Sequence, residues 1–188
     1  MKVIVIDDVF KGTDVKIEEF NKWVINKISS HPGWYLSCDE EREKEIVGSE
    51  FSDTGMLLQS FFRNQDCSQH SEINYLAELI FSQAIEACPH KFTNIEPVRY
   101  LWNYYNRSSD GVIHKDMAEK IVGNYFSMVY YLNDSDGFTI VEDDKFMSKS
   151  GKCIFFDSKL THRGCGPVNS KTRFCLNVIF KYDQIISQ

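Results

Sequence analysis

From Val98 onward, the chain alternates short apolar segments with polar turns, and this alternation limits its fold more than any other feature. Turns are predicted at 108–111, 133–137 and 148–151, where Ser, Asn, Asp and Gly are concentrated. Apolar segments between such turns are typical of antiparallel strands. The C-terminal half is therefore predicted to be a β-structure in which residues far apart in the sequence meet.

Two segments before Val98 have the 3.6-residue period of amphipathic helices, over 14–29 and 71–87. Their apolar positions are Ile17, Phe20, Val24 and Ile28 in the first segment and Ile73, Leu76, Ala77, Ile80 and Ala84 in the second. A helix with one apolar stripe needs a surface to cover. The predicted fold class is therefore α+β, mainly β, with two N-terminal helices packed on one sheet of a sandwich-like barrel.

The length of 188 residues suits a single domain. We expect supporting helices and strands up to about residue 97 and barrel strands from about 98 to 183. The cysteines form no Cys-x-x-Cys pair, so neither a zinc ribbon nor a disulfide framework is predicted.

The net charge is −6, and no stretch gathers several Lys or Arg residues. A nucleic-acid partner is therefore not expected. The apolar run after Met1 is too short for a signal peptide, and no window approaches a membrane span. We expect a cytoplasmic protein without a membrane partner, and the oligomeric state stays open.

A His-x-Asp triplet, His114-Lys-Asp116, introduces candidate chemistry. On a strand, residues i and i+2 point the same way, so His114 and Asp116 can reach one metal ion. A second histidine, His162, follows the apolar segment 153–156 and a polar turn. Two imidazoles and a carboxylate on one face of a six-coordinate metal form the triad of non-haem Fe(II) oxygenases.

A strand is predicted from Thr172 to Phe180, with Arg173 on the face shared by Cys175, Asn177 and Ile179. A guanidinium on the inward face of a barrel needs an anionic partner.

With these residues, the segment from about Tyr100 to Tyr182 resembles the prolyl-4-hydroxylase-like Fe(II)/2-oxoglutarate oxygenases. The elements that carry the resemblance are Trp102-Asn-Tyr-Tyr105, Gly111-Val-Ile-His114-Lys-Asp116, Ser127-Met-Val-Tyr-Tyr131-Leu-Asn133, Asp136-Gly-Phe-Thr139, and His162 with Arg173. The resemblance implies a double-stranded β-helix, which is a jelly-roll or cupin-like barrel. It also implies that His114, Asp116 and His162 are the catalytic Fe(II) ligands.

For the co-substrate, the resemblance implies that Arg173 pairs with the distal carboxylate of 2-oxoglutarate and that Tyr131 hydrogen-bonds the same group. Tyr105 is expected to line this pocket, while Tyr104 points to the opposite face. Asn177 shares the inward face with Arg173, so it is expected either to touch the co-substrate or order water, or to be a hydrogen-bonded amide of the barrel.

The implied activity is a dioxygenase that uses O2 and 2-oxoglutarate to hydroxylate a substrate, with release of succinate and CO2 and with ascorbate as a candidate reductant. Asp116 favours a hydroxylase over a halogenase, because Gly or Ala there would open a halide site. Two alternatives are a cupin-type metal enzyme that does not use 2-oxoglutarate and an inactive barrel that serves as a binding or structural module.

Substrate identity stays open between a protein or peptidyl proline, a free amino acid and another small metabolite, and the resemblance favours a protein or peptide. Phe138 replaces a glycine found in many relatives, and we expect its bulk to narrow the approach to the metal. Segments 39–50 and 63–70 are expected to form loops over the barrel mouth that select the substrate.

Overall fold

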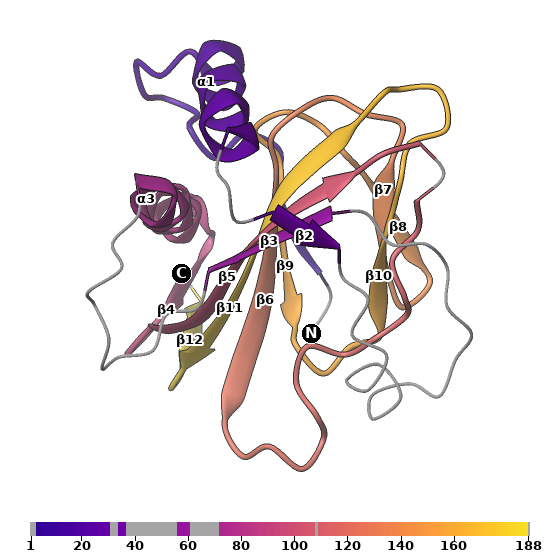
Figure 1. The fold of residues 1–188 in the computed structure, drawn as a ribbon. Helices are drawn as coiled ribbons and strands as arrows, with labels where there is room; N and C mark the ends of the chain where they lie inside the picture. Colours follow the sequence, from indigo (N-terminus) through magenta and orange to yellow (C-terminus); the bar gives the residue numbers. More distant parts are fainter. Residues whose placement is uncertain (1–2, 31–33, 37–55, 61–71, 108, 188) are drawn as a thin grey trace.

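A computed structural model describes residues 3–30, 34–36, 56–60, 72–107 and 109–187. The predicted loops at 39–50 and 63–70 lie outside these residues. Figure 1 shows a large sheet between a helical layer and a small sheet. The mainly β architecture with two helices agrees with the predicted fold class.

The large sheet is built entirely from antiparallel pairs. Its strands follow the order β1 (Ile4–Ile6), β9 (Cys153–Asp157), β6 (Asn124–Tyr131), β11 (Arg173–Tyr182), β5 (Glu96–Tyr105), β3 (Met56–Ser60) and β2 (Trp34–Leu36). Neighbouring strands are thus far apart in the chain, as a jelly roll requires.

The small sheet carries His162, the second histidine of the candidate metal-ligand group. Its order is β10 (His162–Cys165), β7 (Phe138–Val141) and β8 (Asp144–Met147). Isolated bridges from Asp110 to Cys165 and from His114 to His162 place segment 110–114 beside β10. A separate two-stranded sheet joins β4 (His90–Phe92) to β12 (Ile185–Ser187).

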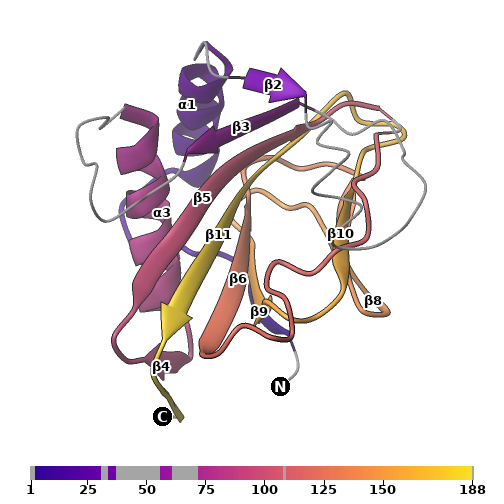
Figure 2. The ribbon, with the colours of Figure 1, turned by 60° about the horizontal axis from the view of Figure 1, so that its bottom comes forward.

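The helices α1 (Ile17–Ser29) and α3 (Glu72–Ala87) lie on one side of the large sheet (Figures 1 and 2). Helix α1 begins three residues later than the expected start at 14. The preceding turn explains the difference, because Thr13 donates to the Phe10 carbonyl and accepts from the Val15 amide. The apolar stripes of both helices are buried with Trp102 and Phe155 of the sheet.

The other side of the large sheet has its own core, which the small sheet covers. Its buried members are Val129, Tyr131, Val141, Ile154, Phe156 and Cys175. Because successive side chains of a strand point to opposite faces of the sheet, the same strands contribute residues to both cores. In the described residues, no helix is long and apolar enough to span a membrane. The four described cysteines are buried and free.

Candidate active site

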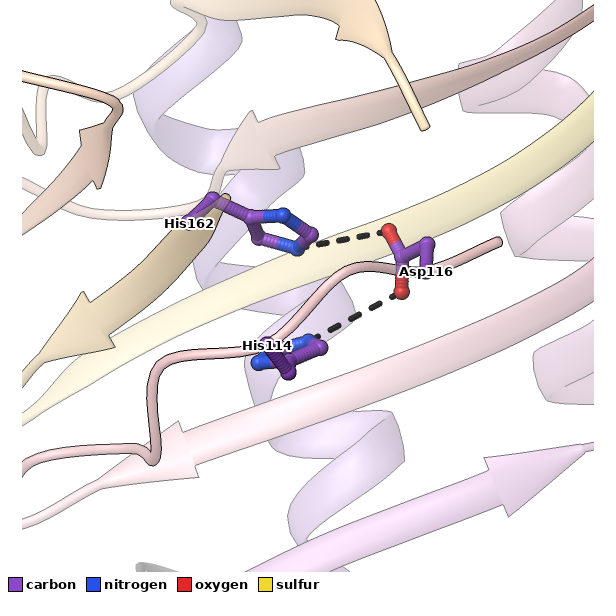
Figure 3. A group of neighbouring side chains, drawn as sticks. All are labelled: His114, Asp116 and His162. Carbon is purple, nitrogen blue, oxygen red and sulfur yellow. Dashed lines mark ion pairs between the residues drawn. The ribbon is translucent and has the colours of Figure 1, made fainter. Parts of the chain in front are cut away.

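The His-x-Asp triplet and the second histidine meet between the two sheets. The His114 amide donates to the His162 carbonyl at 3.0 Å, and the His162 amide donates to the His114 carbonyl at 2.9 Å. This reciprocal bridge brings the two imidazole rings within 4.3 Å, centroid to centroid. Figure 3 shows both rings turned toward the Asp116 carboxylate.

The ring nitrogens of the two histidines have different roles. Nδ1 of His114 lies 2.8 Å from the Val112 carbonyl, and Nδ1 of His162 lies 3.0 Å from the Leu160 carbonyl. A carbonyl accepts only from an N–H, so in the neutral rings Nε2 carries the lone pair. The Nε2 atoms lie 3.8 Å and 3.4 Å from the carboxylate oxygens of Asp116.

These three residues offer one metal-ligand atom each, and the ligand atoms all lie within 4.8 Å of one another. Nε2 of His162 is buried, yet it makes no hydrogen bond to any described residue. Two imidazole nitrogens and one carboxylate oxygen suit a divalent first-row metal, and the set leaves other coordination positions open. The group can hold iron.

The Asp116 side chain is 1% exposed, and both of its oxygens are held. Arg99 of β5 donates from Nη2 to Oδ1 at 2.8 Å, and Ser127 of β6 donates from Oγ to Oδ2 at 2.5 Å. Burial alone would raise the pKa of the Asp116 carboxyl. His162, Arg99 and His114 outweigh burial and hold this pKa well below its usual range. The ligand is thus an oriented carboxylate.

The two histidines shift in opposite directions. Burial and the neighbouring His162 lower the pKa of His114. Burial is also the strongest single influence on His162 and acts to lower its pKa, but the adjacent Asp116 carboxylate and the Leu160 carbonyl together outweigh burial and raise it. Because a metal ligand must be the neutral imidazole, metal binding competes with protonation of His162.

Arg173, the first residue of β11, is 1% exposed. Its Nη2 donates to Thr139 Oγ1 at 2.6 Å. Its guanidinium carbon lies 4.7 Å from the ring centroid of Tyr105 and 5.4 Å from that of Tyr131. Nε and Nη1 of Arg173 are buried and have no acceptor within the described part of the chain. A buried cation with free donors has the chemistry that suits a carboxylate.

Two glycines give the Arg173 side chain its space. A Cβ at Gly137 would lie 2.8 Å from Arg173 Cδ. A Cβ at Gly164 would clash with the Tyr105 hydroxyl and lie 2.9 Å from Arg173 Nη1. Larger residues at either position would displace the guanidinium or the ring beside it.

The expected tyrosines lie around the same guanidinium. The Tyr131 hydroxyl donates to Thr139 Oγ1 at 2.9 Å, and burial raises the pKa of this hydroxyl to about 12, although Arg173 lowers it. Burial also raises the pKa of Tyr105. Tyr104 points to the opposite face, where its ring lies 4.9 Å from Phe174. Of the two neighbours, Tyr105 therefore faces the interior.

Asn177 lies two residues from Cys175 on the interior face of β11 and is 7% exposed. Its Oδ1 is buried and accepts no hydrogen bond from a described residue. This observation favours a ligand or water contact over a satisfied barrel amide. The contact itself stays a prediction.

No family model matches the sequence, and no curated protein matches it. Solved structures do match. A viral collagen prolyl hydroxylase from Paramecium bursaria Chlorella virus-1, in complex with 2-oxoglutarate, is 14% identical, with 96% of each chain covered and a TM-score of 0.58. A Trichoplax adhaerens prolyl hydroxylase in complex with a hypoxia-inducible-factor peptide is 12% identical, covering 96% of this chain and 83% of that one, with a TM-score of 0.57.

A third similar structure is SnoK, a non-haem α-ketoglutarate-dependent carbocyclase from nogalamycin biosynthesis. It is 10% identical, with 99% of this chain and 81% of that one covered, and its TM-score is 0.61. The chain has the fold of the Fe(II)/2-oxoglutarate oxygenases. The double-stranded β-helix predicted from the motifs is thus confirmed.

The expected effect of Phe138 on this oxygenase fold was wrong. Thr139 faces the interior, where it bonds Tyr131 and Arg173. Its neighbour Phe138 therefore points to the opposite face of the small sheet, where Lys145 Nζ lies 3.6 Å from the ring centroid. A side chain on that face cannot narrow the path to the metal.

Three residues that contact the site were not singled out from the sequence: Arg99, Ser127 and Thr139. Arg99 carried one available signal, because it shares the odd-numbered face of its strand with Tyr105. Ser127 and Thr139 lie in motifs that were quoted for the resemblance, but their contacts depend on pairing between distant strands.

Proposed function

We propose that this chain is an Fe(II)- and 2-oxoglutarate-dependent dioxygenase. In the proposed reaction, one oxygen atom of O2 enters a substrate C–H bond to give C–OH. The other enters 2-oxoglutarate, which leaves as succinate and CO2. One observation carries the proposal: a fully buried guanidinium with free donors lies in the same interior as a His-Asp-His group with the iron-ligand composition.

His114, Asp116 and His162 would hold the iron. When bound, iron and 2-oxoglutarate supply the oxidising chemistry for the reaction with O2. The side chains supply orientation: the backbone carbonyls fix both imidazoles, and Arg99 and Ser127 fix the carboxylate.

Arg173 would pair with the distal carboxylate of 2-oxoglutarate, because it is a buried cation whose Nε and Nη1 have no acceptor among the described residues. Tyr131 and Thr139 hold the other side of the guanidinium in place. The buried Arg173 argues against the cupin-type alternative, because an enzyme that does not bind 2-oxoglutarate needs no buried cation at that position. The intact ligand group argues against an inactive barrel.

Hydroxylation is the outcome we propose, because Asp116 supplies a carboxylate where a halide would need room. The substrate is a protein, a peptide or a small metabolite. The similar structures include a carbocyclase as well as prolyl hydroxylases, so the fold alone does not fix the fate of the oxidised carbon.

The test is succinate formation from 2-oxoglutarate by the Fe(II)-loaded protein under air, with ascorbate as reductant. Arg173→Ala should raise the concentration of 2-oxoglutarate needed for half-maximal turnover by about tenfold to a hundredfold, because a buried charge-assisted contact is lost. His162→Ala should abolish turnover. Metal binding without succinate formation in the wild-type protein would favour the cupin-type enzyme, and absence of metal binding would favour the inactive barrel.

A further inference from the structure

The guanidinium of Arg99 lies beside the metal-ligand group. Neither the proposed co-substrate nor the described side chains supply an acceptor for every one of its N–H donors. Arg99 is mostly buried, with a side chain that is 15% exposed. Its Nη2 bonds Asp116 at 2.8 Å. Nε of Arg99 is buried and has no acceptor among the residues described.

The strand register places the two arginines at opposite ends of the interior. Arg99 pairs with Ile179 of β11, which pairs with Ser127 on its other side. Tyr105 pairs with Arg173, six positions before Ile179 on β11. Six strand positions correspond to about 20 Å.

Because Asp116 bonds both Arg99 and Ser127, the ligand group lies at the Arg99 end. A co-substrate anchored on Arg173 therefore approaches the ligand group from one end. Arg99 remains at the other end, where its Nε has no acceptor among the described residues.

With a metal dication and 2-oxoglutarate bound, as the proposed function requires, the charges of the site do not sum to zero unless a further anion binds. Asp116 and one carboxylate of 2-oxoglutarate balance the dication, and Arg173 balances the other carboxylate. The described groups that act on the ligand charges are His114, Asp116, His162 and Arg99. Arg99 and the dication then share the negative charge of Asp116, so one positive charge of this largely buried site is left without a counterion of its own, which is costly.

We propose that the substrate carries a carboxylate that pairs with Arg99. This inference rests on the proposed oxygenase function and narrows its substrate to acids: a small carboxylic acid, or a peptide with an acidic group near the oxidised carbon. A carboxylate would both neutralise Arg99 and hold the reacting carbon beside the metal.

Formate and its neutral isostere formamide test this inference without knowledge of the substrate. The protein is loaded with Mn(II) and saturating 2-oxoglutarate, and the occupancy of both is measured in the same sample. Mn(II) shortens the 13C relaxation times of nuclei held close to it. We expect strong relaxation of formate and not of formamide in the wild-type protein.

Arg99→Gln should weaken formate binding by about tenfold or more, and Arg99→Lys should retain a large part of it. The matched control is Arg163→Gln, which removes a positive charge next to His162 from the outer face of β10 and should change nothing. If Arg99→Gln loses the metal, Arg99→Met takes its place as the uncharged variant, because the wild-type preference for formate would also arise from formate bound directly to Mn(II).

Equal relaxation of formate and formamide in protein that holds both Mn(II) and 2-oxoglutarate would overturn this inference and leave the proposed function intact. Undiminished formate binding in metal-loaded Arg99→Gln would overturn it as well. Failure to bind Mn(II) or 2-oxoglutarate would instead overturn the proposed function, and this inference with it.

Discussion

At the scale of single residues, one hydroxyl organises the Arg173 pocket. Thr139 Oγ1 accepts hydrogen bonds from both Arg173 and Tyr131. Both donors are buried, and a buried donor without an acceptor is costly. Thr139 is itself buried, at 2% exposed.

Thr139→Val should therefore lower the free energy of unfolding by about 1 to 3 kcal/mol without 2-oxoglutarate. Urea unfolding measures this loss. Saturating 2-oxoglutarate should reduce the loss, because its carboxylate can accept from the freed Arg173 donor. Thr139→Ser keeps the hydroxyl and should stay close to wild type. A valine variant as stable as wild type would show that the hydroxyl is not the acceptor that this site depends on.

At the scale of elements, the loop before β11 is fastened to the turn before β7. Asp136 Oδ2 accepts from the amides of Val168 and Asn169 at 3.2 Å and 2.7 Å, and Oδ1 accepts from the Ser170 amide at 2.8 Å. These hydrogen bonds, that of Asn169 first, hold the pKa of Asp136 far below its usual range. The fastened loop sets where Arg173 enters the sheet.

A carboxyl whose pKa is lower in the folded state stabilises the fold above its unfolded pKa of about 4, and this stabilisation is lost as the pH falls further. Asp136→Asn should therefore unfold a few degrees below wild type at pH 7. The difference should shrink as the pH falls below about 4. Thermal unfolding from pH 2.5 to 7 measures it, and a difference that does not change with pH would contradict the assigned role.

From the sequence, the segments that carry the site were predicted more accurately than the direction in which each of their side chains points. His114 and Asp116 follow a local motif, whereas His162 and Arg173 were assigned through the family resemblance, with strand parity giving the face of Arg173. Phe138 was placed on the wrong face because its orientation depends on where β7 enters the sheet, which local pattern does not specify.

The contacts of Arg99 could not be predicted for a related reason. They depend on β5, β6 and β11 lying side by side, although these strands are distant in the chain. Long-range pairing of this kind leaves only the alternation of inward and outward residues as a local signal.

In the whole molecule, the large sheet lies between two hydrophobic cores, one beneath the helices and one beneath the small sheet. The helices cover one side of the large sheet, and the small sheet lies on the other side (Figure 2). Ile80 of α3 is 0% exposed and belongs to the helix-side core. Its contacts stabilise the fold without touching the site.

Ile80→Ala should cost about 2 to 4 kcal/mol of unfolding free energy, through lost burial and a cavity. Below its unfolding transition, the variant should bind Mn(II) as tightly as wild type. Chemical denaturation and metal titration measure the two quantities. A large loss of metal affinity in the folded variant would show that the cores are coupled.

In the proposed oxygenase, three side chains hold Fe(II) and Arg173 anchors 2-oxoglutarate to it. Anaerobic titration of the protein with Fe(II) and 2-oxoglutarate tests this claim, because the chelate has a visible charge-transfer band. We predict a band in wild type that is lost in His162→Ala and needs more 2-oxoglutarate in Arg173→Ala. Lys115→Ala is the matched control, since Lys115 lies between two ligands but pairs with Glu119, and its band should be unchanged. Bound metal without a band in the wild-type protein would contradict the claim.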